Sequence, residues 1–270
     1  MAHGMIELKV RIRRKTFPGK PADVLAGLAF DAGAGEFIAL VGPSGAGKTT
    51  ILNLVGGLDR DMEGEILING QPLTDRQTHP VRYGYMFQEP RLMPWLTVED
   101  NVRLVLDGMD DSTERARQLL REVELEGNER SFPRQLSGGM QRRVALARAF
   151  AVRPMLLLMD EPFISLDAPT AARLREQLLI LWEELRPTVL FVTHDLREAL
   201  SLADRVIFLS GSPARVVKEL RIDMPRPRDP YGKAVTDIHT GLLQAHPDLL
   251  SGLANGSRGE VNEHSERRSA

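Results

Sequence analysis

The sequence contains no cysteine, which excludes disulfide bonds, thiol nucleophiles and thiolate metal ligands. It also lacks any apolar run close to the roughly 18 residues that a membrane-spanning helix needs. Residues 1–14 carry charges but no apolar stretch of the kind found in a signal peptide. We therefore expect a soluble, cytoplasmic protein whose link to any membrane runs through a partner.

Neither sign of charge is in excess, since 35 Lys and Arg residues face 37 Asp and Glu residues. This balance gives no indication of a nucleic-acid partner, although it leaves a local basic patch open. The length of 270 residues allows one large domain or two small ones, and 42% hydrophobic residues suffice for a substantial core.

Apolar periodicity predicts strands that alternate with helices. Residues 6–13 alternate apolar and charged side chains, which indicates a half-exposed strand, whereas residues 36–41 are apolar nearly throughout and indicate a buried one. An Asn-Gly pair at 69–70 predicts a turn. We expect strands at 6–13, 24–30, 36–41, 64–68, 155–159, 188–192 and 205–209, and helices at 48–55, 112–123, 169–185 and 196–202.

This alternation predicts a parallel sheet with helices on both faces. Residues 90–153 interrupt it with mostly helical patterns, so we interpret them as an inserted helical subdomain, with Asp111 or Ser112 capping its helix 112–123. After about Pro225 the periodic signal fades. We place the domain at residues 5–225 and a C-terminal extension at 226–270, whose last twenty residues are polar and expected to be disordered.

Residues 42–49 read GPSGAGKT and match the phosphate-loop pattern G-x-x-x-x-G-K-[ST]. The glycines let backbone N–H groups turn towards phosphates, and the start of the following helix adds a favourable partial charge. Lys48 would reach the β- and γ-phosphates, and the Thr49 hydroxyl would ligate Mg²⁺. The order strand, loop, helix disfavours the alternative of a glycine-rich turn with a chance lysine. The expected binding residues are Gly42, Pro43, Ser44, Gly45, Ala46, Gly47, Lys48, Thr49 and Thr50.

Two carboxylates follow the apolar residues 156–159. A buried strand would deliver them to the edge of the sheet where ligands bind in α/β folds. Asp160 would hold Mg²⁺, directly or through water. Because the next residue points to the other side of the strand, Glu161 is placed to act as the base that polarises an attacking water. The alternative is an acidic pair that caps a strand at the surface.

Residues 136–141 read LSGGMQ and begin a helical pattern. A serine, two glycines and a helix start form a second anion-binding geometry on the same chain. It makes sense if this loop binds the γ-phosphate of a nucleotide held by another copy. Arg142 and Arg143 follow directly, and we expect them on a solvated or interface face rather than in catalysis.

With LSGGMQ between the phosphate loop and the acidic strand, the chain resembles the nucleotide-binding subunit of ABC transporters over about residues 6–220. The resemblance implies a RecA-like P-loop NTPase core with an N-terminal antiparallel β piece and an inserted helical subdomain. It also implies an ATP hydrolase that works as a homodimer closed head-to-tail around two ATP molecules. Each ATP would lie between Lys48 of one chain and Ser137 and Gly139 of the other, with Gly138 and Gln141 in the same loop.

Further residues match the family one by one. Gln88 matches the glutamine that joins the core to the helical subdomain and touches Mg²⁺ and water. Asp167 matches the loop that crosses the dimer interface, and His194 matches the histidine at the γ-phosphate. Phe17 stands where the family has an aromatic residue that stacks on adenine, unless it is a core aromatic. The resemblance thus assigns catalysis to Glu161, His194, Gln88 and Lys48, and Mg²⁺ to Thr49, Gln88 and Asp160.

Several phrases resemble the nitrate, sulfonate and taurine importer branch: FQEPRLMPW at 87–95, MDEPF at 159–163, TVLFVTHD at 188–195 and MPRPRD at 224–229. Ile164 departs from the branch, which often has glycine there. The branch implies import of a small anionic or zwitterionic solute through an integral membrane permease docked near residues 88–95. Trp95 would line that groove, unless it packs inside the helical subdomain.

The same resemblance places the chain peripherally at the cytoplasmic face of the inner membrane, with an extracytoplasmic solute-binding protein as an indirect partner. A rival is a soluble ABC ATPase of DNA repair or translation, but those usually carry coiled-coil insertions or a second ATPase domain. A binding module without chemistry is disfavoured by Lys48, Asp160, Glu161 and His194. Export, or another solute, stays open.

Overall fold

Two β-sheets and a set of helices make up the part of the chain that the computed structural model describes, residues 5–19, 22–73, 81–106, 108 and 110–250. The strands are β1 (Leu8–Lys15), β2 (Leu25–Ala32), β3 (Phe37–Val41), β4 (Glu63–Ile68), β5 (Gln71–Pro72), β6 (Tyr83–Met86), β7 (Leu156–Asp160), β8 (Thr188–Thr193), β9 (Arg205–Leu209) and β10 (Val216–Arg221). The helices are α1 (Lys48–Val55), α2 (Val98–Arg103), α3 (Ser112–Glu122), the 3₁₀ turn η1 (Pro133–Gln135), α4 (Gly138–Ala151), α5 (Ala168–Leu185), α6 (Leu196–Leu202) and α7 (Lys233–Ala245).

The larger sheet has the order β10-β9-β3-β8-β7-β6, and all its pairings are parallel except that of β10 with β9. Its central strand β3 is buried on both faces because successive side chains point to opposite sides. Phe37 and Val41 join the core beneath α4, α5 and α6, whereas Ile38 and Leu40 join the core that contains α1. The predicted parallel sheet with two covered faces is confirmed.

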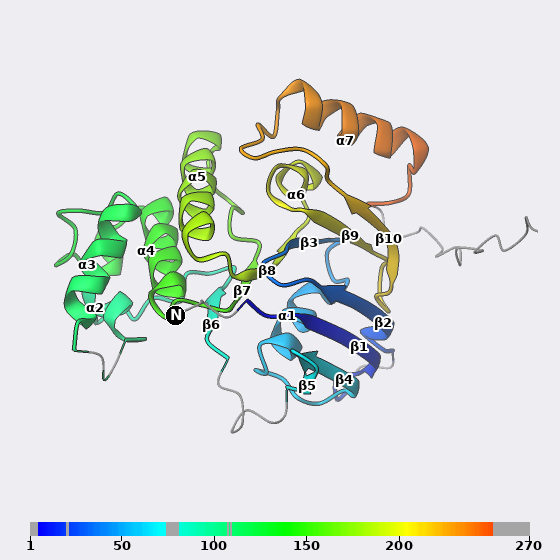
Figure 1. Ribbon diagram of the computed structural model, residues 1–270, viewed down its shortest axis with the longest axis horizontal. Coiled ribbons are helices and arrows are strands. Elements are labelled where there is room, and N and C mark those ends of the chain that lie inside the picture. The colour runs from blue at the N-terminus through cyan, green and yellow to red at the C-terminus, as the bar shows by residue number, and fades with distance from the viewer. Residues whose placement is uncertain (1–4, 20–21, 74–80, 107, 109, 251–270) are drawn as a thin grey trace, which may run out of the picture.

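The smaller sheet is antiparallel, with the order β2-β1-β4-β5. In β1, Leu8, Val10 and Ile12 are buried while the residues between them are exposed, as the alternating sequence predicts. The buried residues pack in the same core as α1, which therefore lies between the two sheets (Figure 1). The expected N-terminal antiparallel β piece is confirmed.

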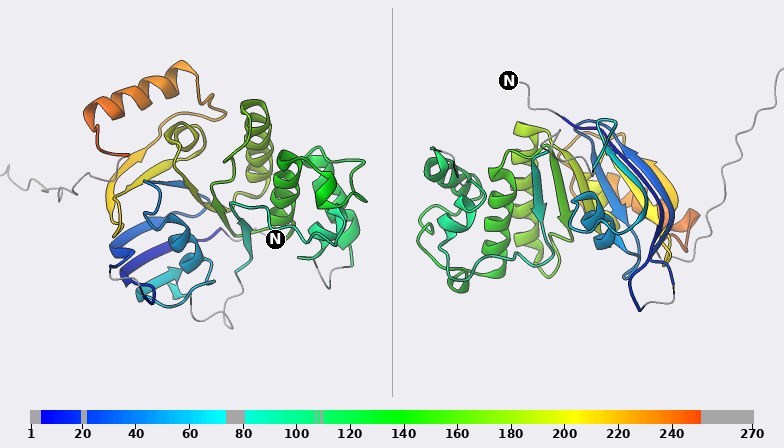
Figure 2. Two further views of the ribbon diagram at one scale, coloured as in Figure 1. Left: turned by 180° about the vertical axis from the view of Figure 1, so that it is seen from behind. Right: turned by 90° about the horizontal axis from the view of Figure 1, so that it is seen from below.

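Helices α2, α3 and α4 follow one another between β6 and β7 and form one end of the molecule (Figure 2). Asp111 occupies the N-cap position of α3, as expected, but its side chain makes no capping hydrogen bond. Thr97 instead caps α2 by accepting from the N–H of Asp100, and Ser137 caps α4 by accepting from the N–H of Met140. The Asn-Gly turn is present, with Asn69 at φ 50° and Gly70 at φ 78°.

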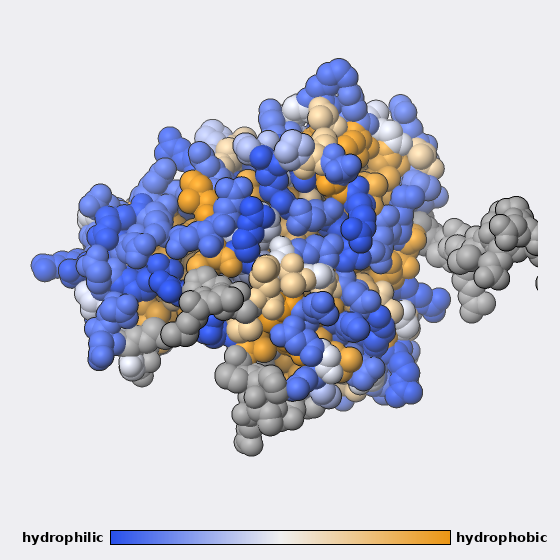
Figure 3. Space-filling model, viewed as in Figure 1, coloured by the Kyte–Doolittle hydropathy of each residue, from blue (hydrophilic) through white to orange (hydrophobic). Residues whose placement is uncertain are grey.

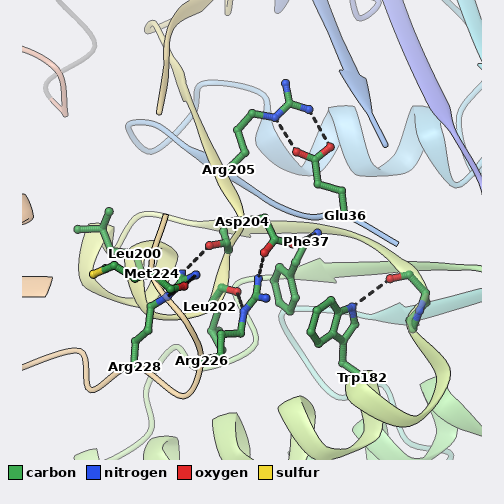
Figure 4. Close-up of polar contacts among 12 residues, drawn as sticks. Glu36, Phe37, Trp182, Leu200, Leu202, Asp204, Arg205, Met224, Arg226 and Arg228 are labelled. Carbon is green, nitrogen blue, oxygen red and sulfur yellow. Dashed lines mark hydrogen bonds and ion pairs between the residues drawn. The ribbon is translucent and has the colours of Figure 1, made fainter. Parts of the chain in front are cut away.

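Part of the described chain after β10 packs against α6. Arg228 donates to the carbonyls of Leu200 and Ala203 near the end of that helix, and Arg226 pairs with Asp204 at 2.7 Å (Figure 4). These contacts suit a helix C-terminus, whose free carbonyls attract cations. Helix α7 then lies on α6 and adds Val235 and Leu242 to the core, an element that the fading sequence pattern did not predict.

In the described residues, no helix is long and apolar enough to cross a membrane. The face drawn in Figure 3 is mostly hydrophilic, with its hydrophobic residues in separate patches. The predicted disorder of the last twenty residues falls outside the part of the chain that the structure describes.

Candidate functional site

A cavity of about 770 Å³ opens at the carboxyl ends of β3, β7 and β8, where parallel sheets bind ligands. Ten of the residues that the sequence assigned to nucleotide binding or catalysis line it, whereas Gly42, Pro43, Ala46 and Asp160 do not. Those lining residues are Phe17, Ser44, Gly45, Gly47, Lys48, Thr49, Thr50, Gln88, Glu161 and His194.

The phosphate loop runs from the end of β3 to the start of α1. Gly47 forms the N-cap with φ 84°, a left-handed conformation that glycine adopts without steric cost. A Cβ there would lie 2.8 Å from Val24 Cγ1, so glycine is also needed for close packing. Glycine at this position therefore allows the sharp turn that the phosphate-loop motif requires.

The Lys48 ammonium is buried inside this loop. Its Nζ donates to the carbonyls of Gly42 at 2.9 Å and Pro43 at 3.0 Å, and lies 3.8 Å from Glu161 Oε1. Burial lowers the pKa of Lys48, while the negative charges of Glu161 and Asp160 oppose that shift. Both hydrogen-bond acceptors of Lys48 are neutral carbonyls. A phosphate that enters the cavity would give the ammonium an anionic acceptor, which forms a stronger hydrogen bond.

Asp160 ends β7 as a buried carboxylate. Burial raises its pKa, and a hydrogen bond from the Thr49 hydroxyl opposes the shift by favouring the charged form. Thr49 and Asp160, two of the three predicted metal ligands, are thus brought together. Among the described residues, no group of three or more Asp, Glu or His side chains could hold a metal by itself. This sparse oxygen donor set fits Mg²⁺, which is usually held by one or two protein oxygens together with phosphates and water.

Glu161 and His194 meet across the strands that carry them. Glu161 Oε2 lies 3.0 Å from His194 Nδ1, and the Glu161 N–H donates to the carbonyl of Val192 in β8. Glu161 has φ 44°, an unusual backbone conformation that turns its side chain towards the cavity and away from the path of the strand. Asp160 accepts a hydrogen bond from Thr49, whereas Glu161 lies beside His194. The two neighbouring carboxylates thus have different partners, as expected if their side chains point in different directions.

Gln88 and Phe17 close two sides of the cavity. Gln88 is exposed just after β6, and its backbone carbonyl accepts a hydrogen bond from Arg142 at 3.0 Å. Phe17 is half-buried, with the Nζ of Lys15 4.6 Å from its ring centroid. The ring thus borders the cavity with part of its surface accessible.

A further group of predicted binding residues lies on a second surface of the chain, which we call the LSGG surface. None of Ser137, Gly138, Gly139, Gln141 and Asp167 lines the cavity. Gly139 packs directly against the start of α5, since a Cβ there would lie 2.4 Å from Thr170 Cγ2. Thr170 in turn donates to Asp167 at 2.7 Å. The LSGG loop and the Asp167 loop are therefore one continuous surface.

Gln141 and Arg142 turn inward from that surface. The Gln141 amide donates to the carbonyls of Pro133 and Leu136, so it braces the loop. Arg142 is only 8% exposed and donates to three carbonyls, which makes the expected solvated face wrong for this residue. Burial of the aliphatic stem and guanidinium inside the fold could not be seen from a motif that reads simply as Arg-Arg.

Four further residues line the cavity without having been predicted: Ala22, Val24, Ile164 and Ser212. Ser212 comes from the loop between β9 and β10 and donates to the carbonyl of Asp23 at 3.1 Å. Its neighbour Ala214 pairs with Leu25, which draws the loop to the cavity. No local motif marks such residues, because only tertiary pairing brings them there.

Comparisons with known proteins agree with this geometry. The ABC transporter family profile matches residues 25–164. The aliphatic sulfonates import ATP-binding protein SsuB of Bacillus cereus is 41% identical over 222 residues, covering 82% of this chain and 87% of that protein. SsuB 2 of Burkholderia cenocepacia is 44% identical over 241 residues, covering 88% and 86%.

Solved structures similar to this chain are also ATP-binding cassettes. A dimeric post-hydrolysis state of the ATP-binding cassette MJ0796, bound to ADP and Pi, superposes with a TM-score of 0.70 at 32% identity. The match covers 82% of this chain and all of that one. A second dimeric structure of MJ0796, a bacterial ABC transporter cassette, is 33% identical with the same TM-score and coverage.

Proposed function

Because this chain belongs to the ABC transporter family, we propose that the cavity beside the phosphate loop is where it binds and hydrolyses ATP. The chain is the ATP-hydrolysing subunit of an importer of small solutes. The observation that carries the site assignment is that Lys48 and Glu161, from two separate motifs, line one cavity 3.8 Å apart, while the charge of Asp160 also acts on Lys48. The names of the relatives support an aliphatic sulfonate or a similar small anion as the solute.

In the proposed complex, Lys48 and the loop N–H groups bind the β- and γ-phosphates, and Phe17 stacks on adenine. Thr49, Asp160 and Gln88 would hold Mg²⁺, which supplies charge neutralisation of the phosphate oxygens. The support is the shared hydrogen bond of Thr49 and Asp160 and the position of Gln88 at the cavity.

Hydrolysis needs a base near the γ-phosphate, and we assign that role to Glu161. Its carboxylate accepts a proton from water as the water oxygen bonds to the γ-phosphorus and the bond to the β,γ-bridging oxygen breaks. His194, 3.0 Å from the other carboxylate oxygen, orients Glu161 and contacts the γ-phosphate. Lys48 stabilises the charge that develops on the leaving diphosphate.

The LSGG surface has no role within its own cavity, and we propose that it completes the cavity of a second copy. Ser137, exposed at the start of the fourteen-residue helix α4, would meet the γ-phosphate of the partner's ATP. Gly138 and Gly139 keep the approach open, and Asp167 crosses the interface beside them. Gln141 supports the loop from behind. The dimeric relatives are in line with this arrangement.

We propose that residues 5–225 form the nucleotide-binding domain, that 90–153 are its helical subdomain, and that 226–270 are a C-terminal extension, of which Arg226, Arg228 and α7 contact α6. An integral membrane permease would dock at residues 88–95, which places the chain at the cytoplasmic face of the membrane. A solute-binding protein would act through the permease. Trp95 is 72% exposed, so the alternative that it packs inside the helical subdomain is wrong.

Replacement of Lys48 tests the proposed cavity. Lys48→Ala removes a buried charge aimed at the phosphates, and should weaken ATP binding by about 30-fold or more and abolish hydrolysis. Isothermal titration with ATP and Mg²⁺ measures the affinity. Lys9→Ala, which alters an exposed lysine on β1, is the control and should bind like the wild type. Unchanged affinity of Lys48→Ala would contradict the assignment.

A further inference from the structure

Arg142 ties three parts of the chain together. It lies in the second turn of α4, and its guanidinium donates to the carbonyl of Gln88 at 3.0 Å, of Pro162 at 3.1 Å and of Ile164 at 2.7 Å. These acceptors belong to two segments more than 70 residues apart, one after β6 and one after β7. A planar guanidinium with donors in a fixed fork can hold both segments in one relative position.

Each acceptor is next to the nucleotide chemistry. Gln88 and Ile164 line the cavity, and Pro162 directly follows Glu161. The backbone that orients the proposed base and the backbone that orients Gln88 are thus held by one side chain. A displacement of Arg142 would move both groups relative to the γ-phosphate.

The energetic setting of Arg142 supports a specific role. The side chain is buried, its three hydrogen bonds all go to neutral carbonyls, and burial lowers its pKa. Burying a cation with only neutral acceptors is costly, and an apolar residue would fill the same space without that cost. Packing alone therefore does not account for an arginine here.

A second arginine of α4 extends the same connection. Arg148 donates to the carbonyls of Pro90 at 2.7 Å and Arg91 at 2.9 Å. The segment that begins at Gln88 is consequently fastened to α4 at both of its ends. Any rigid movement of α4 carries this segment with it.

The N-terminus of α4 is the LSGG loop, capped by Ser137. We propose that Arg142 is a positioning residue that couples the two ATP sites of the dimer. ATP in the partner's cavity draws Ser137 towards its γ-phosphate, and α4 then moves as a rigid body. Because Arg142 moves with α4, it repositions Gln88 and Glu161 in the chain's own cavity. This inference rests on the proposed composite dimer site.

Steady-state ATP hydrolysis, measured as a function of ATP concentration, tests the coupling on the full-length chain. Arg142→Gln should lower kcat by between about 3-fold and 30-fold and bring the Hill coefficient close to one. ATP affinity, measured by titration, should stay within about twofold because no phosphate contact is lost. A purely structural defect would instead lower affinity, kcat and melting temperature together.

Two further variants sharpen the test. Arg143 lies on the same helix but contacts the helical region, through the carbonyls of Val123 and Glu124 and an ion pair with the Glu124 carboxylate, so Arg143→Gln should keep the wild-type Hill coefficient. Arg142→Lys keeps the charge but loses the fork, and should behave like Arg142→Gln; it also serves if the glutamine variant does not fold. Full activity and cooperativity in Arg142→Lys would overturn the inference.

The failure of the inference differs from the failure of the proposed dimer site. Ser137→Arg, which should block the partner's γ-phosphate, is the reference. If the wild type is cooperative and Ser137→Arg is inactive, but Arg142→Gln stays cooperative, only the inference is wrong. If the wild type hydrolyses ATP without cooperativity and Ser137→Arg is fully active, the composite site is wrong and the inference with it.

Discussion

Burial shifts the pKa values of two charged side chains near the ATP cavity. It lowers the pKa of Lys48 and raises that of Asp160, while the ionic and hydrogen-bonding partners of each residue oppose the shift. Such opposed effects are common at functional sites, where charged groups must be desolvated yet remain ionised. The phosphates of ATP and a bound Mg²⁺ would relieve both costs.

Glu198 provides a test of this principle just outside the cavity. Its Oε2 accepts from Thr193 Oγ1 at 2.8 Å, and burial raises its pKa from 4.5 to about 7; Thr193, Arg175 and His194 oppose the shift, whereas Asp195 adds to it. Because the folded state holds the proton more tightly, this group stabilises the fold fully below pH 4.5, and the contribution is lost as pH rises through about 7.

Glu198→Gln should therefore match the wild type in stability near pH 4 and exceed it at pH 8, by no more than roughly 3 kcal/mol. Thermal unfolding at both pH values measures the difference. Glu184→Gln, an exposed change on α5, is the control and should show no such pH dependence. A constant difference between Glu198→Gln and the wild type at both pH values would argue against the buried, proton-holding carboxyl.

At the scale of single residues, the sequence predicted those that belong to short contiguous motifs. Lys48 and Glu161 reach the cavity because a strand fixes where the following residues emerge. Ser212 and Arg142 were missed or misjudged, since their positions depend on partners far away in the chain. No period or spacing records those partners.

Among the elements, strongly periodic segments were predicted well: α6 and β9 have the expected bounds, and α5 begins one residue earlier than expected. Short β6 was not predicted. Its Gly84 is required by packing, because a Cβ there would lie 2.5 Å from the carbonyl oxygen of Ala149, and glycine weakens the strand pattern. Helix α7 was not predicted either. Its apolar residues Val235, Ile238 and Leu242 do stand at helical spacing, so the sequence contains a helical pattern that our prediction missed.

The contact of α4 with α5 at Gly139 yields a prediction about the LSGG surface. Gly139→Ala places a Cβ against the Thr170 methyl group, and should lower stability by about 1–3 kcal/mol and weaken ATP-dependent dimerisation. Adding Thr170→Ser removes that methyl group, keeps the hydroxyl for Asp167, and should restore most of both properties. Thermal melts and light scattering measure them. If the double variant is no more stable and dimerises no better than Gly139→Ala, the contact with the Thr170 methyl group is not the cause of the defect.

For the whole molecule, the sequence predicted the two-sheet architecture and the family, but it does not name the solute, because this subunit does not contact it. The C-terminal brace was also missed. Arg226 and Arg228 bind the end of α6 through carbonyls and Asp204, contacts that depend on tertiary folding.

We expect the permease to dock on the surface near α2. Trp95→Ala removes a large exposed aromatic side chain of the kind that dominates interfaces, and should lower transport by at least about tenfold while basal ATP hydrolysis and melting temperature stay nearly unchanged. Tyr231→Ala changes a similarly exposed aromatic residue beside α7 and is the control for nonspecific effects. Solute uptake by reconstituted transporter is the readout. Equal losses in both variants would argue against a specific docking role for Trp95.

In the proposed dimer, two chains close around ATP and each completes the other's site. Glu161→Gln removes one negative charge per chain from an interface crowded with phosphates and carboxylates, and leaves the shape unchanged. It also removes the proposed base, which should slow hydrolysis by about 10²- to 10⁴-fold. Bound ATP then persists between Lys48 of one chain and Ser137 of the other.

Size-exclusion chromatography with light scattering, on Glu161→Gln with and without saturating ATP, is the most direct measurement. We expect a monomer without ATP, a dimer with ATP, and a monomer in both conditions once Ser137→Arg is added. The run is repeated with the permease present, so that a dimer that needs the membrane subunit is also detected. A Glu161→Gln chain that stays monomeric with ATP in both settings, or a dimer that survives Ser137→Arg, would show that the two chains do not complete each other's sites.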